Sequence, residues 1–418
     1  MQSEHEHETR PMNEALGDEA VVEEQEMNTE EPLPEITDWD ELELEPNLLR
    51  GIFAYGFEKP SPIQRKAILP IVEGRDVIAQ AQSGTGKTAT FSIGALQRLQ
   101  LNEQATQVLV LSPTRELASQ TAKVISSLAA FLPGFRIQTA FGGASMDEDR
   151  GGGSRFSNKQ APHVVCGCPG RVYDMMRREK LSTKHIKMVV LDEADEMLSA
   201  GFKEQVYNIF QYLNSDTQVC LVSATLPESI QHIVSKIMRN PVRICVKREQ
   251  LTLEGIQQYF VAVDDDQQKY SALKDLYSFL NMSQTIIYCN SIKRVQDLYE
   301  AMLGDGFPVC CIHSNMDKGE RDKAFDDFRS GASRVLISSN VTARGIDIQQ
   351  VSVVINFDLS KCVNTYLHRI GRSGRWGRKG VGINFITRRD VPLLQRIEEH
   401  YSTQIQELPA DTTFLRNL

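Results

Sequence analysis

The chain alternates short apolar runs with longer segments in which apolar residues recur at helical spacing. Short apolar runs between turn-forming residues are typical of buried strands, and helical spacing is typical of amphipathic helices. In the first half, strand-like runs occupy residues 76–80, 108–111, 164–166, 188–191 and 219–222. This alternation predicts an α/β fold, in which a parallel sheet carries helices on both faces.

The second half repeats the pattern after a break. Residues 241–256 form a mixed charged stretch without the alternation. Strand-like runs then resume at residues 259–263, 285–288, 309–312, 335–337, 351–355 and 381–385. A length of 418 residues suits two domains that each bury a core. We therefore expect two tandem domains of one architecture, residues 39–243 and 256–418, joined by a short linker at residues 244–255.

The first 38 residues differ in composition from the rest of the chain. They are rich in Glu and show no sustained period, which is typical of a disordered acidic tail. Residues 1–45 hold 17 Asp and Glu against one Arg, so the net charge of −9 hides a body with 45 Lys and Arg against 38 acids. A mildly basic body suits a polyanion-binding protein, although an ordinary solvated surface carries the same charge.

Composition also excludes several classes of protein. No apolar run approaches the length of a membrane span, and the acidic N-terminus is unlike a signal or transit peptide. The eight cysteines include no C-x-x-C pair, so neither a zinc cluster nor a thioredoxin-like motif is indicated. We expect a monomer without a membrane partner, in the cytosol or the nucleus.

A glycine-rich stretch, AQSGTGKT at residues 81–88, lies between a strand-like run and a helical segment. Glycines 84 and 86 allow backbone N–H groups to approach an anion at the start of a helix. Lys87 is then placed to bind the β- and γ-phosphates of a nucleotide, and the Thr88 hydroxyl to bind Mg²⁺. A glycine-rich turn that merely opens a helix is the alternative.

Phe57 and Gln64, upstream of this loop, are residue types that recognise a nucleotide base. An aromatic ring stacks on adenine, and an amide both donates to and accepts from its edge. A core phenylalanine and a helix-capping glutamine explain these residues equally well on local grounds.

Polar residues follow two other strand-like runs directly. Residues 188–191 lead into Asp192-Glu193-Ala194-Asp195, and residues 219–222 lead into Ser223-Ala224-Thr225. Ligands of parallel sheets bind beyond the carboxyl ends of the strands. Asp192 is therefore expected to bind Mg²⁺, and Glu193 to orient and deprotonate the attacking water. A plain polar loop is the alternative.

The second half has no phosphate loop of its own but is rich in arginine near its end. Residues 366–380 read YLHRIGRSGRWGRKG, and ARGID lies upstream at residues 343–347. Such arginines can act as fingers on a phosphate bound to another domain. A nucleic-acid patch is the competing interpretation, and one cluster can serve both purposes.

Together these stretches resemble the DEAD-box RNA helicases in order and spacing. The matching motifs are GFEKPSPIQ (56–64), AQSGTGKT, PTRELA (113–118), the glycine pair 142–143, DEAD (192–195), SAT (223–225), ARGID and HRIGRSGR (368–375). The nearest group is that of eukaryotic initiation factor 4A. Within it, VKREQLTLEGI, FRSGASRVLIS and YSTQI resemble the nuclear exon-junction-complex paralogue more than the cytoplasmic translation factor. The resemblance implies two RecA-like domains.

The resemblance also implies a site for ATP and Mg²⁺. The residues that would bind ATP are Phe57, Gln64, Ser83, Gly84, Thr85, Gly86, Lys87, Thr88 and, at the ribose, Asp347. The metal would be held by Thr88 and Asp192. The residues that would carry catalysis are Lys87, Asp192, Glu193, Arg372 and Arg375, with the two arginines closing on the γ-phosphate.

By the same resemblance, RNA would be bound through its backbone, without choice of sequence. The residues that would bind it are Pro113, Thr114, Arg115, Gly143, Gly170, Arg171, Arg321, Ser339 and Gly345. Ser223 and Thr225 would couple ATP hydrolysis to RNA release. Cys168, Lys318 and Asn340 depart from the family pattern on the RNA side. Differences from the family are therefore expected in RNA affinity rather than in ATP hydrolysis.

We therefore expect an RNA-dependent ATPase and RNA helicase. Its partners would be RNA and proteins of an exon-junction or initiation-factor scaffold. Nuclear mRNA metabolism is the favoured role, and a cytoplasmic helicase of translation initiation is the alternative. An RNA-binding clamp that hydrolyses little ATP is a further alternative.

Overall fold

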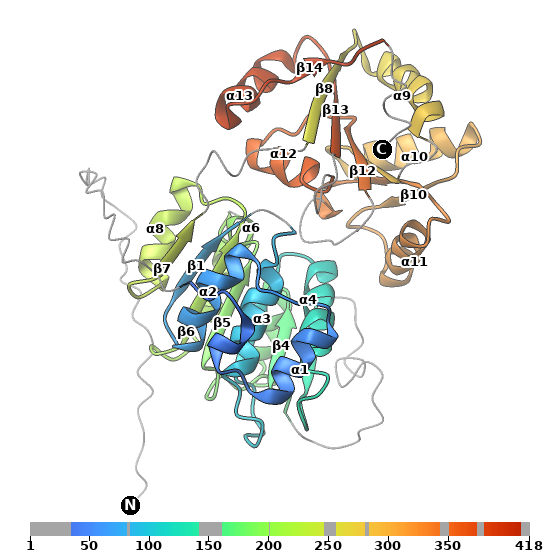
Figure 1. Cartoon of the computed structure of the whole chain (residues 1–418). Coiled ribbons are helices and arrows are strands. Elements are labelled where there is room, and N and C mark those ends of the chain that lie inside the picture. The colour runs from blue at the N-terminus through green and yellow to red at the C-terminus, as the bar shows by residue number, and fades with distance from the viewer. Residues whose placement is uncertain are drawn as a thin grey trace, which may run out of the picture. The chain divides into compact units, whose positions relative to one another are not determined.

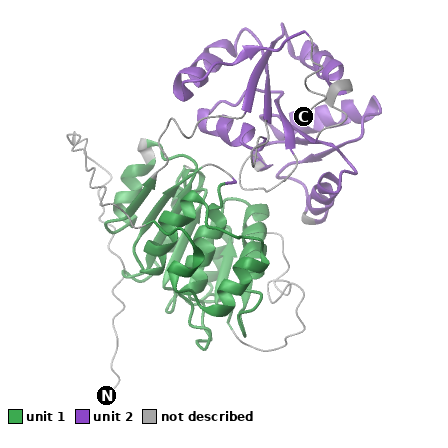
Figure 2. Ribbon diagram, in the orientation of Figure 1, with its two compact units in different colours: residues 1–81, 85–245 green, residues 82–84, 246–418 purple. Residues whose placement is uncertain are grey.

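The computed structural model describes residues 35–81, 84–141, 161–199, 201–245, 256–280, 284–342, 351–373 and 380–410. The chain forms two compact units, residues 1–81 with 85–245 (unit 1) and residues 82–84 with 246–418 (unit 2), as Figure 2 shows. Each unit is built on a parallel sheet with helices, so the two tandem RecA-like domains are confirmed. None of the described helices is both long and apolar enough to cross a membrane.

Unit 1 contains a seven-stranded parallel sheet in the order β3-β4-β2-β5-β6-β1-β7 (Figure 1). Its strands are β1 (Val77–Gln80), β2 (Val108–Leu111), β3 (Ile137–Ala140), β4 (Val164–Gly167), β5 (Met188–Asp192), β6 (Gln218–Ser223) and β7 (Val242–Cys245). The inner strands β2, β4, β5 and β6 are buried along their whole length. Burial on both faces explains why they read as continuous apolar runs.

Helices cover both faces of this sheet. They are η1 (Trp39–Leu42), α1 (Pro46–Ala54), α2 (Pro62–Val72), α3 (Lys87–Gln97), α4 (Arg115–Leu128), α5 (Pro169–Arg177), α6 (Ala194–Met197), α7 (Lys203–Phe210) and α8 (Glu228–Ile237). Figure 1 shows α1 to α4 over one face. On the other, Val172 of α5, Ile209 of α7 and Val234 of α8 share a core with Val189 and Leu191 of β5.

Unit 2 repeats the same topology in the order β10-β11-β9-β12-β13-β8-β14. Its strands are β8 (Ile256–Ala262), β9 (Gln284–Tyr288), β10 (Val309–Ile312), β11 (Val335–Ser338), β12 (Val351–Asn356), β13 (Gly380–Ile386) and β14 (Gln406–Glu407). Its helices are α9 (Asp266–Leu280), α10 (Ile292–Gly304), α11 (Lys318–Arg329), η4 (Asn340–Thr342), α12 (Val363–Ile370) and α13 (Val391–Tyr401). Alternate residues of β9 enter two cores, Ile286 with α12 and α13 and Ile287 with α9 and α10.

The structure corrects two expected boundaries. Ile36 is buried and its N–H donates to the Arg65 carbonyl at 3.1 Å, so the folded part of unit 1 begins before residue 39. Strand β7 runs to Cys245, where the linker was expected to have started. The remaining linker residues, 246–255, and tail residues 1–34 lie outside the described residues. The first boundary was misplaced because Ile36 stands alone among polar residues, and the second because Arg243 interrupts the apolar run of β7.

Candidate functional site

The glycine-rich loop connects the end of β1 to the start of α3. Gly84 has a φ of +83° and Gly86 a φ of +94°, a backbone conformation that residues with a Cβ rarely adopt. A Cβ on Gly86 would also lie 2.8 Å from Gln64 Nε2. Helix α3 begins at Lys87, so backbone N–H groups and the positive end of a helix meet at the loop. The loop is therefore shaped for an anion. Ser83 lies outside the described residues.

The Lys87 side chain provides an independent sign of an anion site. The residue is 7% exposed, and its Nζ has no hydrogen-bond partner among the residues that the structure describes. A buried cation without a partner is costly. The phosphates of a nucleotide at the loop would supply both the counter-charge and the acceptors. The residues present therefore fit the phosphate-binding role expected for Lys87.

Gln64 ties the base-recognition segment to this loop. Its Oε1 accepts a hydrogen bond from the Ser61 N–H at 2.7 Å, and its Nε2 donates to the Gly86 carbonyl at 3.5 Å. The Ser61 hydroxyl donates to the Thr85 carbonyl at 2.9 Å. Gln64 thus helps to cap the N-terminus of α2, as the helix-capping alternative predicts, and it also contacts the phosphate loop. The serine, which the sequence analysis did not single out, forms the second link.

Phe57 lies in a different environment from a core phenylalanine. The residue is only half-buried, and its ring centroid lies 4.8 Å from that of the exposed Tyr55. Its carbonyl accepts a hydrogen bond from the buried Trp39 Nε1 at 3.1 Å, which fixes its backbone. A ring that is held by its backbone and partly exposed is available for stacking.

The first two acids of the DEAD motif, Asp192 and Glu193, lie at the carboxyl end of β5. Both are buried, and Glu193 has a positive φ of 53°. Asp192 Oδ1 accepts a hydrogen bond from the Glu193 N–H at 3.0 Å, whereas Oδ2 has no partner within the described ranges. Burial raises the pKa of Asp192, the Glu193 charge raises it further, and Lys87 lowers it. A divalent cation at Oδ2 would compensate the buried charge. Asp192 therefore fits a metal site, and Thr88, the other expected metal ligand, lies in the first turn of α3 next to Lys87.

The SAT motif is connected to both neighbouring motifs. The Thr225 hydroxyl donates to Asp195 Oδ2 at 2.7 Å. The Ala81 N–H donates to the Ser223 carbonyl at 3.1 Å, which joins the end of β6 to the start of the phosphate loop. The expected coupling residues Ser223 and Thr225 thus lie between the nucleotide-binding segments. Asp195 carries this connection but had been given no role, although the DEAD motif names it.

The RNA residues expected in unit 1 lie at the N-termini of α4 and α5. The Thr114 hydroxyl caps α4 by accepting from the Leu117 N–H at 3.2 Å. Gly170 and Arg171 begin α5, and a Cβ on Gly170 would lie 3.2 Å from Gln205 Oε1. The two helices follow neighbouring strands, β2 and β4, so the expected residues Pro113, Thr114, Arg115, Gly170 and Arg171 share one edge of the sheet. Gly143 lies outside the described residues.

The departure at Cys168 has a visible structural setting. Cys168 occupies the N-cap position of α5, its N–H donates to the Ala140 carbonyl at 2.9 Å, and its side chain does not cap the helix. A hydroxyl at this position would be a stronger donor and acceptor than a thiol. The departure of this chain from the family pattern at residue 168 therefore lies at the same helix end that carries Gly170 and Arg171.

The RNA residues expected in unit 2 that the structure describes are Arg321 and Ser339. The buried Arg321 guanidinium donates to the Met316 carbonyl at 3.3 Å and to the Ser314 carbonyl at 3.4 Å. It thereby holds the turn that precedes α11. Ser339 follows β11, and its N–H donates to the Ile312 carbonyl at 3.4 Å. Gly345 and Asp347 lie outside the described residues.

Arg372 follows α12 directly and is 2% exposed. Its Nε donates to the His368 carbonyl at 3.2 Å, so the last turn of the helix orients the side chain. Arg375, the other expected arginine finger, lies outside the described residues. Arg369 is fully buried in the same helix. No role was expected for Arg369, although it stands in the arginine cluster of residues 366–380.

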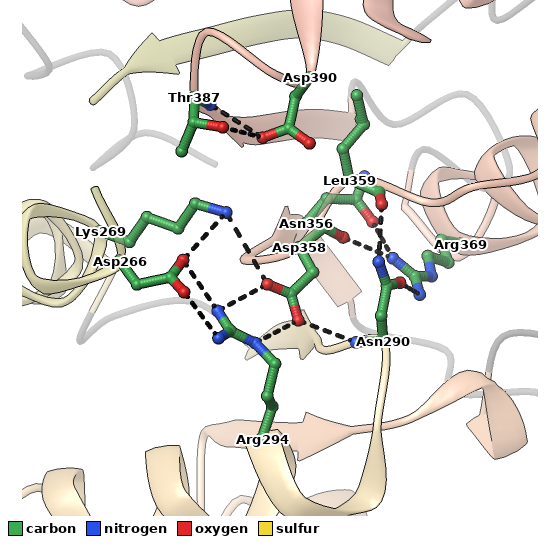
Figure 3. Close-up of polar contacts among 10 residues, drawn as sticks. All are labelled: Asp266, Lys269, Asn290, Arg294, Asn356, Asp358, Leu359, Arg369, Thr387 and Asp390. Carbon is green, nitrogen blue, oxygen red and sulfur yellow. Dashed lines mark hydrogen bonds and ion pairs between the residues drawn. The ribbon is translucent and has the colours of Figure 1, made fainter. Parts of the chain in front are cut away.

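Unit 2 carries ion pairs at the positions that correspond to Lys87 and Asp192 of unit 1. Lys269 follows the end of β8 by the same number of residues as Lys87 follows β1. Asp192 ends β5, and Asp358 lies two residues after β12, the strand with the same place in the sheet order. Lys269 Nζ lies 3.8 Å from Asp358 Oδ1 and 3.7 Å from Asp266 Oδ1. Arg294 pairs with both acids (Figure 3). The positions that stay open in unit 1 are therefore neutralised by side chains in unit 2.

Comparisons with known proteins agree with this geometry. Residues 61–233 match the family DEAD/DEAH box helicase, and residues 268–377 match the Helicase conserved C-terminal domain. The ATP-dependent RNA helicase eIF4A of Lodderomyces elongisporus is 53% identical over 373 residues, which cover 89% of this chain and 92% of that protein. The protein of the same name from Neosartorya fischeri is 50% identical over 402 residues, 96% of this chain and all of that protein.

A solved structure also resembles this chain. Saccharomyces cerevisiae Dbp5 bound to RNA and ADP BeF3 has a TM-score of 0.83 and 36% identity, with 90% of this chain and 96% of that chain covered. That structure contains both ligands that the sequence and the geometry indicate for this chain, a nucleotide and RNA.

Proposed function

Because the chain belongs to the DEAD-box family of ATP-dependent RNA helicases, we propose that it opens short RNA structures in translation initiation, as an RNA-stimulated, Mg²⁺-dependent ATPase. The observation that best supports a nucleotide site is a pair of buried polar atoms without hydrogen-bond partners among the described residues, Lys87 Nζ and Asp192 Oδ2. A phosphate chain and a cation would satisfy one atom each. Bound Mg²⁺ would supply charge compensation for the phosphates and for Asp192.

The residues of unit 1 then have separate tasks. Lys87 and the N–H groups before α3 would hold the phosphates, and Gln64 would read the base beside Phe57. Glu193 would accept the proton of the attacking water. Arg372 and Arg375 of unit 2 would stabilise the charge that develops on the γ-phosphate when RNA favours closure of the two units.

The decisive assay is steady-state phosphate release with and without poly(U). We expect RNA to raise the rate, because it would favour the closed arrangement in which the arginines act. Glu193→Gln is the matched control, since it keeps the shape of the site but removes the base. Equal rates with and without RNA would contradict the proposal and favour an RNA clamp with little turnover.

The cellular role rests on the relatives. Proteins named ATP-dependent RNA helicase eIF4A are 50% and 53% identical to this chain over most of its length. They favour the cytoplasmic translation role over the nuclear role that the stretches VKREQLTLEGI and YSTQI had suggested. Nuclear mRNA metabolism is therefore the second candidate, and these stretches are the observation in its favour.

Imaging and affinity capture separate the two roles. We expect a tagged chain to be diffuse in the cytoplasm and to recover initiation-factor scaffolds from a nuclease-treated lysate. Nuclear signal together with exon-junction proteins would overturn the translation role and would leave the ATPase chemistry untouched. A functional check is a translating extract, where we expect added Glu193→Gln protein to inhibit initiation on structured leaders more than on unstructured ones.

A further inference from the structure

We propose that Arg369 links the candidate RNA-binding loop after β11 to Arg372, with Asn340 and Asn290 as positioning residues. These four residues are called the Arg369 relay. The inference rests on the proposed function, because it requires RNA contact at Ser339 and an action of Arg372 on ATP. It adds a route, inside unit 2, by which bound RNA affects hydrolysis.

The Arg369 guanidinium is enclosed by hydrogen-bond acceptors of unit 2. It is fully buried and donates five hydrogen bonds, all to neutral oxygens. Asn340 Oδ1 accepts two of them, at 3.0 Å from Nε and 2.7 Å from Nη2. Asn290 Oδ1, Asn356 Oδ1 and the Asp358 carbonyl accept the others at 2.8, 3.1 and 2.8 Å. Burial lowers the pKa of Arg369 to about 10, so the group stays charged at neutral pH.

The asparagines that accept these hydrogen bonds lie at or just after the ends of three strands. Asn340 adjoins Ser339 after β11, Asn290 follows β9, and Asn356 ends β12. These are three neighbouring strands of the sheet. A single side chain of α12 is therefore hydrogen-bonded to the carboxyl ends of all three strands. A shift of any of these ends changes the position of the helix.

Arg369 is connected to Arg372 by hydrogen bonds at the C-terminal end of α12. The Arg372 N–H donates to the Arg369 carbonyl at 3.2 Å, and Arg372 Nε donates to the His368 carbonyl at 3.2 Å. The Arg372 side chain is thus oriented by the same turn of helix that Arg369 holds. Displacing Arg369 would move the group that acts on the γ-phosphate.

The two asparagines of the relay are held differently, and Figure 3 shows the Asn290 end. Asn290 is held firmly, since its N–H donates to Asp358 Oδ2 at 3.0 Å and its Nδ2 donates to the Leu359 carbonyl at 2.9 Å. Arg294 in turn fixes Asp358 through two contacts of 2.7 Å. Both asparagines are exposed, but it is Asn340 that adjoins Ser339, the residue expected to contact RNA. Movement caused by RNA would therefore enter at Asn340, while Asn290 serves as the fixed point.

The nature of residue 340 is also informative. This chain has an amide at residue 340, where aspartate would supply a carboxylate of nearly the same size. A carboxylate would form a charge-assisted pair with Arg369, about twice as strong as a hydrogen bond between neutral groups. Asn340 accepts the same two hydrogen bonds from Arg369 without that charge.

The test compares the stimulation factor, the ratio of kcat with saturating poly(U) to kcat without RNA. Asn340→Ala should lower this factor about tenfold, because Arg369 loses an acceptor for two of its hydrogen bonds. Asn340→Asp should keep at least the natural factor, since a carboxylate oxygen accepts the same bonds. Asp390→Ala is the matched control, because Asp390 Oδ2 also accepts two hydrogen bonds in unit 2, from Thr387 at 2.9 and 2.8 Å.

Thermal melting of each variant separates a relay from a merely structural role. A lower melting temperature of Asn340→Ala with a stimulation factor within about twofold of the natural one would overturn the relay. The relay would also be overturned if Asn340→Ala reached the natural stimulation factor at saturation but needed a higher concentration of poly(U). Asn340 would then be a simple binding residue. If the alanine variant does not fold, Asn340→Ser is measured in the same way. Absence of stimulation in the natural chain would instead overturn the proposed function.

Discussion

The Thr225 hydroxyl donates a 2.7 Å hydrogen bond to Asp195 Oδ2 inside unit 1. Both residues are buried, and they follow the neighbouring strands β6 and β5. The Thr225 N–H also lies 3.3 Å from Ser223 Oγ, which accepts from it. The SAT and DEAD motifs therefore form one hydrogen-bonded group. Asp195 of the DEAD motif is thus connected to Ser223 of the SAT motif through Thr225.

Thr225→Val tests this connection. The change keeps the shape but leaves Asp195 Oδ2 without this donor, so we expect a loss of about 1–3 kcal/mol in the free energy of unfolding of unit 1. ATP affinity should stay close to that of the natural chain, whereas the number of duplexes opened per ATP should fall.

The measurements are chemical denaturation, nucleotide titration and a strand-displacement assay. Thr217→Val is the control, because Thr217 is a buried residue directly before β6, at the end of the strand opposite to Thr225, and its hydroxyl donates to the Ile186 carbonyl at 3.3 Å. Equal loss of unwinding in both variants would show that the effect is one of stability.

Lys87→Met should separate stability from binding. Methionine has a similar length but no charge, so the ligand-free chain no longer buries an unpartnered ammonium, and Asp192, whose pKa is raised, can take up a proton. We expect a higher melting temperature without nucleotide and no further rise with Mg²⁺–ATP. The natural chain should show the rise. An ATP-dependent shift retained in the variant would contradict the role of Lys87.

Glu193→Gln should keep ATP binding and abolish turnover. The amide fills the same space but cannot accept the proton of the water. Fluorescence anisotropy of labelled RNA should show slower release in the presence of ATP, because the closed state is no longer resolved by hydrolysis. Turnover close to that of the natural chain would mean that another group activates the water.

Much of this arrangement could be predicted from the sequence, for a physical reason. Strands buried on both faces read as unbroken apolar runs, so the inner strands were found nearly at their observed bounds. The strands that were missed, β3, β7 and β14, lie at or next to sheet edges. There Arg243 and both residues of β14 are exposed, and the apolar signal is interrupted.

The local motifs also predicted the ATP site because phosphate binding depends on backbone conformation, and glycines at 84 and 86 reveal it. Arg369 could not be found in the same way. Its acceptors come from β9, β11 and β12, which are far apart in sequence, and each is an ordinary asparagine when read alone. Contacts that depend on strand order require the three-dimensional structure.

The stability of unit 1 should fall below neutral pH because of His163. Nδ1 of the buried imidazole accepts from the Arg136 N–H at 3.1 Å, so this nitrogen must be unprotonated. Burial lowers the pKa of His163 below 6.5, and the Arg136 charge lowers it further. The unfolded chain therefore binds the proton more readily, and stability is lost as the pH falls below 6.5.

Denaturation of the natural chain and of His163→Gln between neutral pH and pH 5.5 isolates this contribution. We expect the difference in free energy of unfolding between the two proteins to shrink as the pH falls. A constant difference would show that His163 does not titrate in this range.

Unit 2 should depend strongly on Asp358. Its carboxylate contacts Arg294 twice at 2.7 Å and accepts from the Asn290 N–H at 3.0 Å, and its side chain is 10% exposed. Asp358→Asn would leave two cations, Arg294 and Lys269, with Asp266 as their remaining acid in this cluster. Removing one partner of a buried pair costs about 3–5 kcal/mol, and this is the loss expected in the free energy of unfolding.

The control is Asp266→Asn, since the Asp266 side chain is 61% exposed and also pairs with Arg294. We expect a loss of at most about 1 kcal/mol there, because solvent screens the pair. Adding Arg294→Met to Asp358→Asn should recover part of the larger loss by removing the unpaired charge. Equal losses at residues 358 and 266, measured by urea denaturation, would show that burial does not govern this cluster.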